Sequence, residues 1–281
     1  MKKLTSILAA AAIAAPVWAA SLGVGGSSVI APSGACHPVM STDGGKVLYS
    51  TGDYHGLWIA NLATGETAQI SDAVASGFAP RFTADGSGVV YRTESRVDFL
   101  RMKNVMSYDI ATAGNTELAP MSRATANLAS YAAPQLTQAR GNYREIVVTA
   151  NGIERRISPI EGAYSYLWVS LSPNAQRILF VEAHTGMHIC NLDGSGLISL
   201  GRGSYPSWLS DEWVLFTSST HDGEHITASQ IMAVEVATGN VSEITAADSM
   251  TEEASGSIDA GKIAVSDTDG QLTLIDIYLI D

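Results

Sequence analysis

Short runs of apolar and β-branched residues recur along the chain from residue 36 onward, and glycine-containing turns separate them. In the first copy of this pattern, apolar runs cover Val47–Ser50, Leu57–Leu62 and Ala68–Ser71, and the turn Ala63-Thr64-Gly65 lies between the last two. Thr-Gly, Asp-Gly and Asn-Gly pairs tolerate the positive φ of tight hairpins. Gly or Pro interrupts the pattern before a 3.6-residue period is established. The pattern therefore predicts antiparallel strands and almost no helix.

The order of these parts repeats six times. Successive copies begin at Cys36, Ala79, Ala133, Leu167, Tyr205 and Ser257. The 246 residues from Cys36 to Asp281 give about 41 per copy, which fits one four-stranded propeller blade of roughly 40–45 residues. We therefore predict an all-β protein, a six-bladed β-propeller of four-stranded antiparallel blades, with a shortened third copy.

The last copy lacks chain for a fourth strand, whereas Ser27–Ile30 near the start belongs to no copy. A propeller must close its ring to bury the faces of its end blades. We therefore expect this N-terminal segment to supply the outer strand of the last blade, within a single domain spanning residues 20–281.

Four segments carry a resemblance to a known family: Pro80–Gly86, Trp168–Asn174, Asn191–Gly196 and Pro206–Asp211. They resemble the repeats of TolB-like six-bladed β-propellers, whose blades carry a Pro-x-aromatic-Ser-x-Asp-Gly turn before an Ile/Val-rich strand. The resemblance implies the propeller fold. Full-length family members also have a preceding α/β domain and a role in envelope protein assemblies, and the resemblance covers only the propeller part.

Residues 1–19 have the pattern of a cleaved signal peptide. A basic start at Met1–Lys3 precedes the apolar run Ile7–Val17, and Val17-Trp18-Ala19 places small side chains at the −3 and −1 positions. A membrane anchor is the alternative, but the run is shorter than the roughly 20 residues that span a bilayer and contains Pro16. We therefore expect a periplasmic or secreted protein with no membrane span after cleavage.

The charge of the chain narrows the range of partners. Its formal net charge is −12, and removing the two lysines of the signal peptide would leave −14. With no Lys/Arg-rich block, it is poorly suited to nucleic acid or an anionic membrane surface. The chain has two cysteines, Cys36 and Cys190. An oxidising compartment would permit a disulfide between them, but we favour two unpaired residues.

The topology of a propeller sorts the loops into two faces. Links from the second to the third strand of each blade, and from the fourth strand to the next blade, emerge on one face, which includes the longer links 93–103 and 218–229. Long loops on a rigid frame commonly carry function. All six histidines sort to this long-loop face, so we predict a ligand or partner site made of His37, Tyr54, His55, Arg96, Phe99, Arg101, His184, His188, Tyr205, His221 and His225.

A metal site is the sharper alternative for four of these histidines. Neighbouring fourth and fifth blades could bring His184 or His188 to His221 and His225. We favour no cofactor, with a divalent metal as the alternative, because neither His-x₃-His pair falls on a predicted helix that would align the two side chains. Four tryptophans fall in predicted strands and are assigned to packing between blades: Trp58, Trp168, Trp208 and Trp213.

Motifs for hydrolytic chemistry are absent from the sequence. There is no Gly-x-Ser-x-Gly elbow, and Glu252 and Glu253 are expected to be adjacent in a loop. We favour a non-catalytic module that recognises a protein or peptide partner of the cell envelope. The alternative is a carbohydrate-active enzyme, such as a metal-dependent lyase of acidic oligosaccharides. This alternative would gain support if four basic residues converged on the mouth of the central channel of the propeller: Arg92, Arg96, Arg101 and Lys103.

Overall fold

The structure, a computed structural model, describes residues 20–133 and 137–280. The expected signal peptide, residues 1–19, lies outside this range. The first half of the chain forms β1 (Ser21–Ala31), β2 (Cys36–Met40), β3 (Lys46–Ser50), β4 (Leu57–Asn61), β5 (Thr67–Ser71), β6 (Arg81–Phe82), β7 (Gly88–Val97), β8 (Leu100–Asp109), β9 (Gly114–Ser122) and the short helix α1 (Ala129–Ala132). The second half forms β10 (Gln138–Asn142), β11 (Glu145–Ala150), β12 (Ile153–Ile157), β13 (Tyr166–Leu171), β14 (Arg177–Glu182), β15 (Gly186–Asn191), β16 (Ile198–Gly201), β17 (Ser204–Trp208), β18 (Trp213–His221), β19 (Ile226–Glu235), β20 (Val241–Glu243), β21 (Thr251–Ser257), β22 (Lys262–Asp267) and β23 (Leu272–Ile280).

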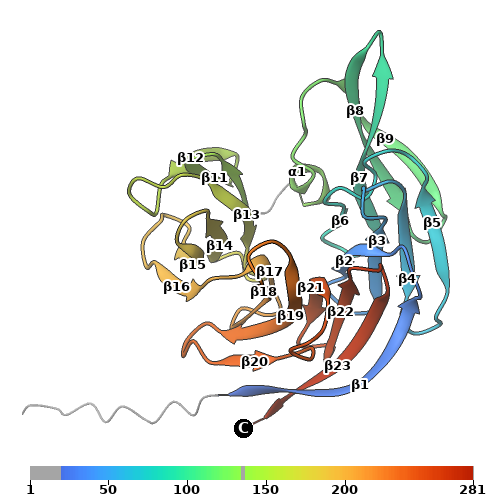
Figure 1. The fold of residues 1–281 in the computed structure, drawn as a ribbon. Helices are drawn as coiled ribbons and strands as arrows, with labels where there is room; N and C mark the ends of the chain where they lie inside the picture. Colours follow the sequence, from blue (N-terminus) through green and yellow to red (C-terminus); the bar gives the residue numbers. More distant parts are fainter. Residues whose placement is uncertain (1–19, 134–136, 281) are drawn as a thin grey trace, which may run out of the picture.

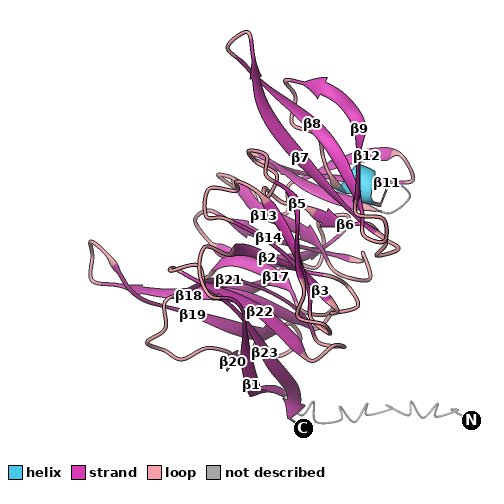
Figure 2. Cartoon of the chain, turned by 90° about the vertical axis from the view of Figure 1, so that its right-hand side faces the viewer, coloured by secondary structure: helices cyan, strands magenta, loops and turns pink. Residues whose placement is uncertain are grey.

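These strands form six antiparallel sheets, which Figures 1 and 2 show from two directions. Blades 1, 2, 4 and 5 each contain four consecutive strands: β2–β5, β6–β9, β13–β16 and β17–β20. Blade 6 pairs β21–β23 with β1, and blade 3 contains β10–β12. The predicted six-bladed propeller is confirmed. Blade 3 differs from the four-stranded blades, because it has three strands within the described residues.

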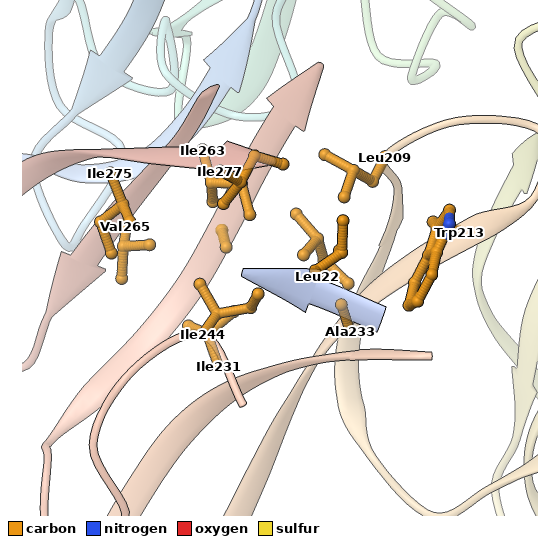
Figure 3. Packing of buried hydrophobic residues seen from close by; sticks show 12 residues of the cluster. Leu22, Leu209, Trp213, Ile231, Ala233, Ile244, Ile263, Val265, Ile275 and Ile277 are labelled. Carbon is orange, nitrogen blue, oxygen red and sulfur yellow. The ribbon is translucent and has the colours of Figure 1, made fainter. Parts of the chain in front are cut away.

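Strand β1 closes the ring as predicted. It pairs antiparallel with β23, with Ser27 opposite Ile275 and Ser28 opposite Leu274. The side chain of Leu22 on the same strand is 6% exposed and packs into the cluster between blades 5 and 6, which Figure 3 shows. Burial of a leucine side chain contributes about 1.5–3 kcal/mol, so the N-terminal strand is held by packing as well as by its ladder.

Buried apolar clusters join five of the six pairs of neighbouring blades. They arise because successive residues of a strand face opposite sides of the sheet, so a blade with a neighbour on each side buries both of its faces. Blade 2 is different on its side toward blade 3, where Val90 and Val105 are covered by Leu128 and by Ala132 of α1. Among residues 20–133 and 137–280, no buried hydrophobic cluster links blade 2 to blade 3.

The two cysteines lie on different blades and are both unpaired, as favoured from the sequence. Cys36 is partly buried on β2, and Cys190 is fully buried on β15. Burial, with a smaller contribution from the charge of Asp193, raises the pKa of the Cys190 thiol to about 12. No helix in the described ranges is both long enough and apolar enough to cross a bilayer.

Candidate functional site

The innermost strands of several blades share a local irregularity near their first residues. In blades 1, 4 and 5 the pairing register shifts, so that two residues of the inner strand lie opposite one residue of its neighbour. The first residue of each bulge has a left-handed φ: His37 (57°), Trp168 (48°) and Tyr205 (49°). Ala79, just before β6, has the same conformation in blade 2, with φ 53°. Such bulges redirect side chains, and non-glycine residues in this region of φ are uncommon.

The redirected side chains line one central cavity of about 380 Å³. His37, Trp168 and Tyr205 meet there with Tyr54 and Phe78, which come from the links after β3 and β5. We call this cavity the funnel. Its walls also include Glu253 of β21, so the funnel combines aromatic surfaces with one carboxylate.

His37 is the most constrained polar group in the funnel. Its Nδ1 lies 3.1 Å from both carboxylate oxygens of Glu253, its Nε2 lies 3.3 Å from the carbonyl oxygen of Gly52, and its ring stacks on Tyr54 with centroids 4.0 Å apart. Burial lowers the pKa of His37, but the hydrogen bond and the charge of Glu253 outweigh burial, so that the net pKa is raised. The imidazole is therefore held toward its protonated form.

Aromatic contacts continue around the funnel. Tyr54 meets Phe78 edge-on with ring centroids 5.0 Å apart, and Trp168 meets Tyr205 in the same manner at 5.1 Å. Burial, followed by the negative charge of Glu253, raises the pKa of both Tyr54 and Tyr205. Both phenols therefore stay neutral at physiological pH, and their faces carry the partial negative charge that attracts cations.

The funnel contains three of the predicted site residues, and the remaining ones lie elsewhere. Arg96, Phe99 and Arg101 lie at the end of the β7–β8 hairpin, where Phe99 is 99% exposed. The expected loop 93–103 is wrong in form, because β7 and β8 remain paired as far as Val97 and Leu100. Residues 218–229 likewise form mostly paired strands β18 and β19, with His221 and His225 near their tip.

Three other histidines have local structural partners. The Nε2 of His55 lies 2.7 Å from the carbonyl oxygen of Asp72, and His184 contacts the Tyr164 ring. His188 is buried, stacks on Phe180 and has its Nε2 2.8 Å from Thr185 Oγ1. Within the described ranges, no three His, Cys, Asp or Glu side chains are grouped so that they could hold a metal ion. The structure does not gather the four histidines of the metal hypothesis.

The basic residues named for the oligosaccharide alternative do not converge on the funnel. Arg101 and Lys103 are bound to Glu94, at 3.4 and 3.9 Å, on the β7–β8 hairpin. Arg96 lies opposite Arg101 in the backbone register of the same hairpin. Arg92 lines a different cavity, between blades 2 and 3, and its guanidinium lies over the Phe78 ring.

Phe78, Trp168 and Glu253 are funnel residues that sequence reasoning missed. Trp168 was assigned to packing between blades, but it is 42% exposed and its bulge directs it into the funnel. Glu253 was expected in a loop, but it lies within strand β21, opposite Ser266. In three blades the residue with left-handed φ stands before a proline, as in His37-Pro38, Ala79-Pro80 and Tyr205-Pro206, but Trp168 is followed by Val169 and carries no such signal.

Six antiparallel sheets arranged around a central funnel define a six-bladed β-propeller. The fold is similar to those of a putative TolB from Agrobacterium tumefaciens (15% identity, TM-score 0.53, 93% of this chain and 98% of that one) and a protein of unknown function from Bacteroides thetaiotaomicron (8%, 0.58, 92% and 77%). TolB from Acinetobacter baumannii matches at TM-score 0.47 with 14% identity over 88% of this chain, which spans only 55% of that protein's length. No family model and no curated protein matches the sequence. At these identities the similarity establishes the TolB-like propeller fold alone.

Proposed function

We propose that this chain is an exported, non-catalytic β-propeller that binds a protein or peptide partner at the funnel. The observation that carries the proposal is the repeated left-handed bulge, which directs His37, Trp168 and Tyr205 from three blades into one cavity. Non-glycine residues in this conformation cost of order 1–3 kcal/mol each and persist where the surrounding structure enforces them, often at functional sites. Export is inferred from the pattern of residues 1–19.

The composition of the funnel supports recognition of a side chain from a partner. Trp and Tyr are the residue types most enriched in the energetically dominant contacts of protein interfaces. A cavity of about 380 Å³ is near the lower end of ligand pockets, so it fits one or two side chains better than a long sugar chain. The partner would therefore insert a short anchor and make its other contacts on the surrounding rim.

The aromatic faces of the funnel indicate the chemistry of this anchor. Glu253 is already paired with His37 at 3.1 Å, so the surface left for a partner is made by the rings of Tyr54, Trp168 and Tyr205. A cation over an aromatic face gains about 0.5–2 kcal/mol, more when it is desolvated. The anchor is therefore a basic side chain, Lys or Arg, on an exposed segment of the partner.

The test is selection of displayed random peptides on the purified protein, followed by affinity measurement of the enriched sequences. We expect enrichment of Lys or Arg, with affinity reduced at least tenfold by Trp168→Ala and by Tyr205→Ala, since truncating a central aromatic anchor costs 2 kcal/mol or more. Tyr278→Ala is the matched control, because Tyr278 is an exposed aromatic of β23 outside the funnel. Failure to enrich any peptide, or equal affinity for the two funnel variants and the control, would contradict the proposal.

A further inference from the structure

The contact between blades 2 and 3 differs from the other five because no buried apolar cluster joins the two blades within the described residues. It contains a cavity of about 1020 Å³, lined by residues of both blades, of the segment that leads into α1 and of β13 in blade 4. We call this cavity the seam. Hydrogen-bonding side chains dominate its walls, and Asn127 Nδ2 donates to Gln138 Oε1 across it at 2.9 Å.

Arg92 is the unusual residue of the seam. Its side chain is 8% exposed, and its guanidinium lies over the Phe78 ring, with Cζ 5.1 Å from the ring centroid. Its one hydrogen bond among the described residues is a long one, from Nη2 to the carbonyl oxygen of Ala126 at 3.4 Å. No carboxylate in residues 20–133 and 137–280 lies within 4.0 Å of this group.

A second arginine adds positive charge to the same cavity. Arg81 on β6 lines the seam and also has no ion pair within the described ranges. Arg140, on the opposite wall, is matched by Glu154 at 3.3 Å. Burial lowers the pKa of Arg92, the charge of Glu94 opposes this change, and the charge of Arg81 adds to it. A buried charge without a counter-ion is costly, and this chain carries an excess of acidic residues that could have supplied one.

We propose that the seam is a second binding site, which takes a small polar ligand and holds an oxyanion group of that ligand against Arg81 and Arg92. Guanidinium groups bind carboxylate and phosphate through paired N–H donors, so either group provides the missing counter-charge. Asn127, Gln138 and Thr149 supply neutral hydrogen-bonding groups for the rest of the ligand. The seam shares Phe78, Ala79 and Trp168 with the funnel, but Arg81 and Arg92 line the seam and not the funnel.

The test uses calorimetric titration of the mature protein with glutarate and, separately, with inorganic phosphate at low ionic strength. We expect at least one of the two anions to bind with 1:1 stoichiometry. Binding of glutarate alone assigns a carboxylate ligand, binding of phosphate alone assigns a phosphate ligand, and binding of both assigns the shared oxyanion chemistry. Absence of binding for both anions would overturn the proposal.

Variants locate the binding to the seam. Arg81→Gln and Arg92→Gln should each weaken binding at least tenfold, whereas Arg101→Gln, which removes the same charge from the β7–β8 hairpin, should leave it unchanged. If the buried Arg92 variant fails to fold, as judged by circular dichroism, Arg81→Gln decides the matter because its side chain is exposed within the cavity. Unchanged affinity in Arg81→Gln, or an equal loss in Arg101→Gln, would overturn the proposal, and neither result bears on peptide binding at the funnel.

Discussion

His37 and Glu253 connect the first blade to the last, with the imidazole Nδ1 3.1 Å from each carboxylate oxygen. This contact is a polar counterpart to the strand pairing that closes the ring. It also fixes the orientation of His37 inside the funnel, where the ring stacks on Tyr54. One ion pair therefore links closure of the fold with the geometry of the candidate site.

Glu253→Gln should lower the pKa of His37. Burial, which favours neutral imidazole, would remain after the substitution, whereas the charge of Glu253 would be removed and the glutamine amide would accept only a weaker, uncharged hydrogen bond. NMR titration of the His37 ring protons measures the change. Glu252→Gln is the graded control, because Glu252 acts on His37 through its charge alone and is the weakest of the contributors to its pKa.

The same pair makes stability depend on pH. Folding raises the pKa of His37 above its value in the unfolded chain, near 6.5. The contribution of protonated His37 to the free energy of unfolding is therefore fully present below pH 6.5 and is lost as pH rises through the folded pKa. Denaturant unfolding should therefore show a difference between wild type and Glu253→Gln at pH 5.5 that narrows above pH 8. A difference that widens with rising pH would contradict this assignment.

Leu22→Ala should destabilise the protein by about 2–5 kcal/mol, the range for removing a buried leucine side chain. Leu22 is buried between blades 5 and 6, and its backbone nitrogen donates to Ser242 Oγ at 3.0 Å. Val29→Ala on the same strand is the matched control, since Val29 is 55% exposed and a surface change of this kind stays within about 0.5 kcal/mol. Equal effects of the two substitutions in denaturant unfolding would mean that β1 is held by its ladder alone.

The fold could be predicted from the sequence because its main signals are local and repeated. Asp43-Gly44 and Asp85-Gly86 mark the same hairpin turn in two blades, and both glycines have positive φ, 65° and 70°. The unassigned Ser27–Ile30 was enough to predict closure, because a ring with a missing strand has one place for it. The polar contact between blades 2 and 3 was not predictable, since it depends on side chains of separate segments, such as Asn127 and Gln138, meeting across the space between the blades.

The site was predicted only in part because it depends on backbone geometry that one sequence does not encode visibly. The position of Trp168 follows from a bulge that changes the sign of φ at that single residue. Without the bulge, strand alternation would direct its side chain differently. Topology sorts the histidines to one face, but it gives no distances, and it does not separate a hairpin tip such as His225 from the funnel.

Ala175→Gly should stabilise the protein by about 0.5–1 kcal/mol. Ala175 occupies the turn position that Gly86 has in blade 2, with φ 56°, and its backbone nitrogen donates to Ser172 O at 2.8 Å. Relief of about 1–2 kcal/mol of left-handed strain is partly offset by about 0.4–1 kcal/mol of greater freedom in the unfolded chain.

The reciprocal substitution provides the control. Gly86→Ala should destabilise the protein by about 1 kcal/mol through backbone strain, because an added Cβ at this position meets no atom within 4 Å. The equivalent change at Gly44 should cost more, since its Cβ would collide with that of Ala260. A destabilised Ala175→Gly variant in thermal unfolding would show that packing, rather than φ, decides this turn.

Glu182→Gln should destabilise the protein by about 1–3 kcal/mol at pH 7, the cost of disrupting buried charged hydrogen bonds. Glu182 is buried, and its carboxylate accepts from the backbone nitrogens of Tyr164, His184 and Thr185 at 2.9–3.0 Å. Burial raises its pKa, but these donors and the Thr185 hydroxyl outweigh burial and lower the pKa to about 2. The carboxylate therefore shapes the loop that carries His184.

The pH dependence of this effect follows from the direction of the shift. Folding lowers the pKa of Glu182 below its value in the unfolded chain, about 4.5. The stabilisation by the Glu182 carboxylate is therefore present above pH 4.5 and is lost as pH falls toward 2. The stability gap between wild type and Glu182→Gln should therefore shrink between pH 5 and pH 2, while amide exchange at His184 and Thr185 is faster in the variant at neutral pH. Glu161→Gln, at an exposed position, should show neither effect. A gap that stays constant down to pH 2 would mean that shape, and not charge, is what Glu182 provides.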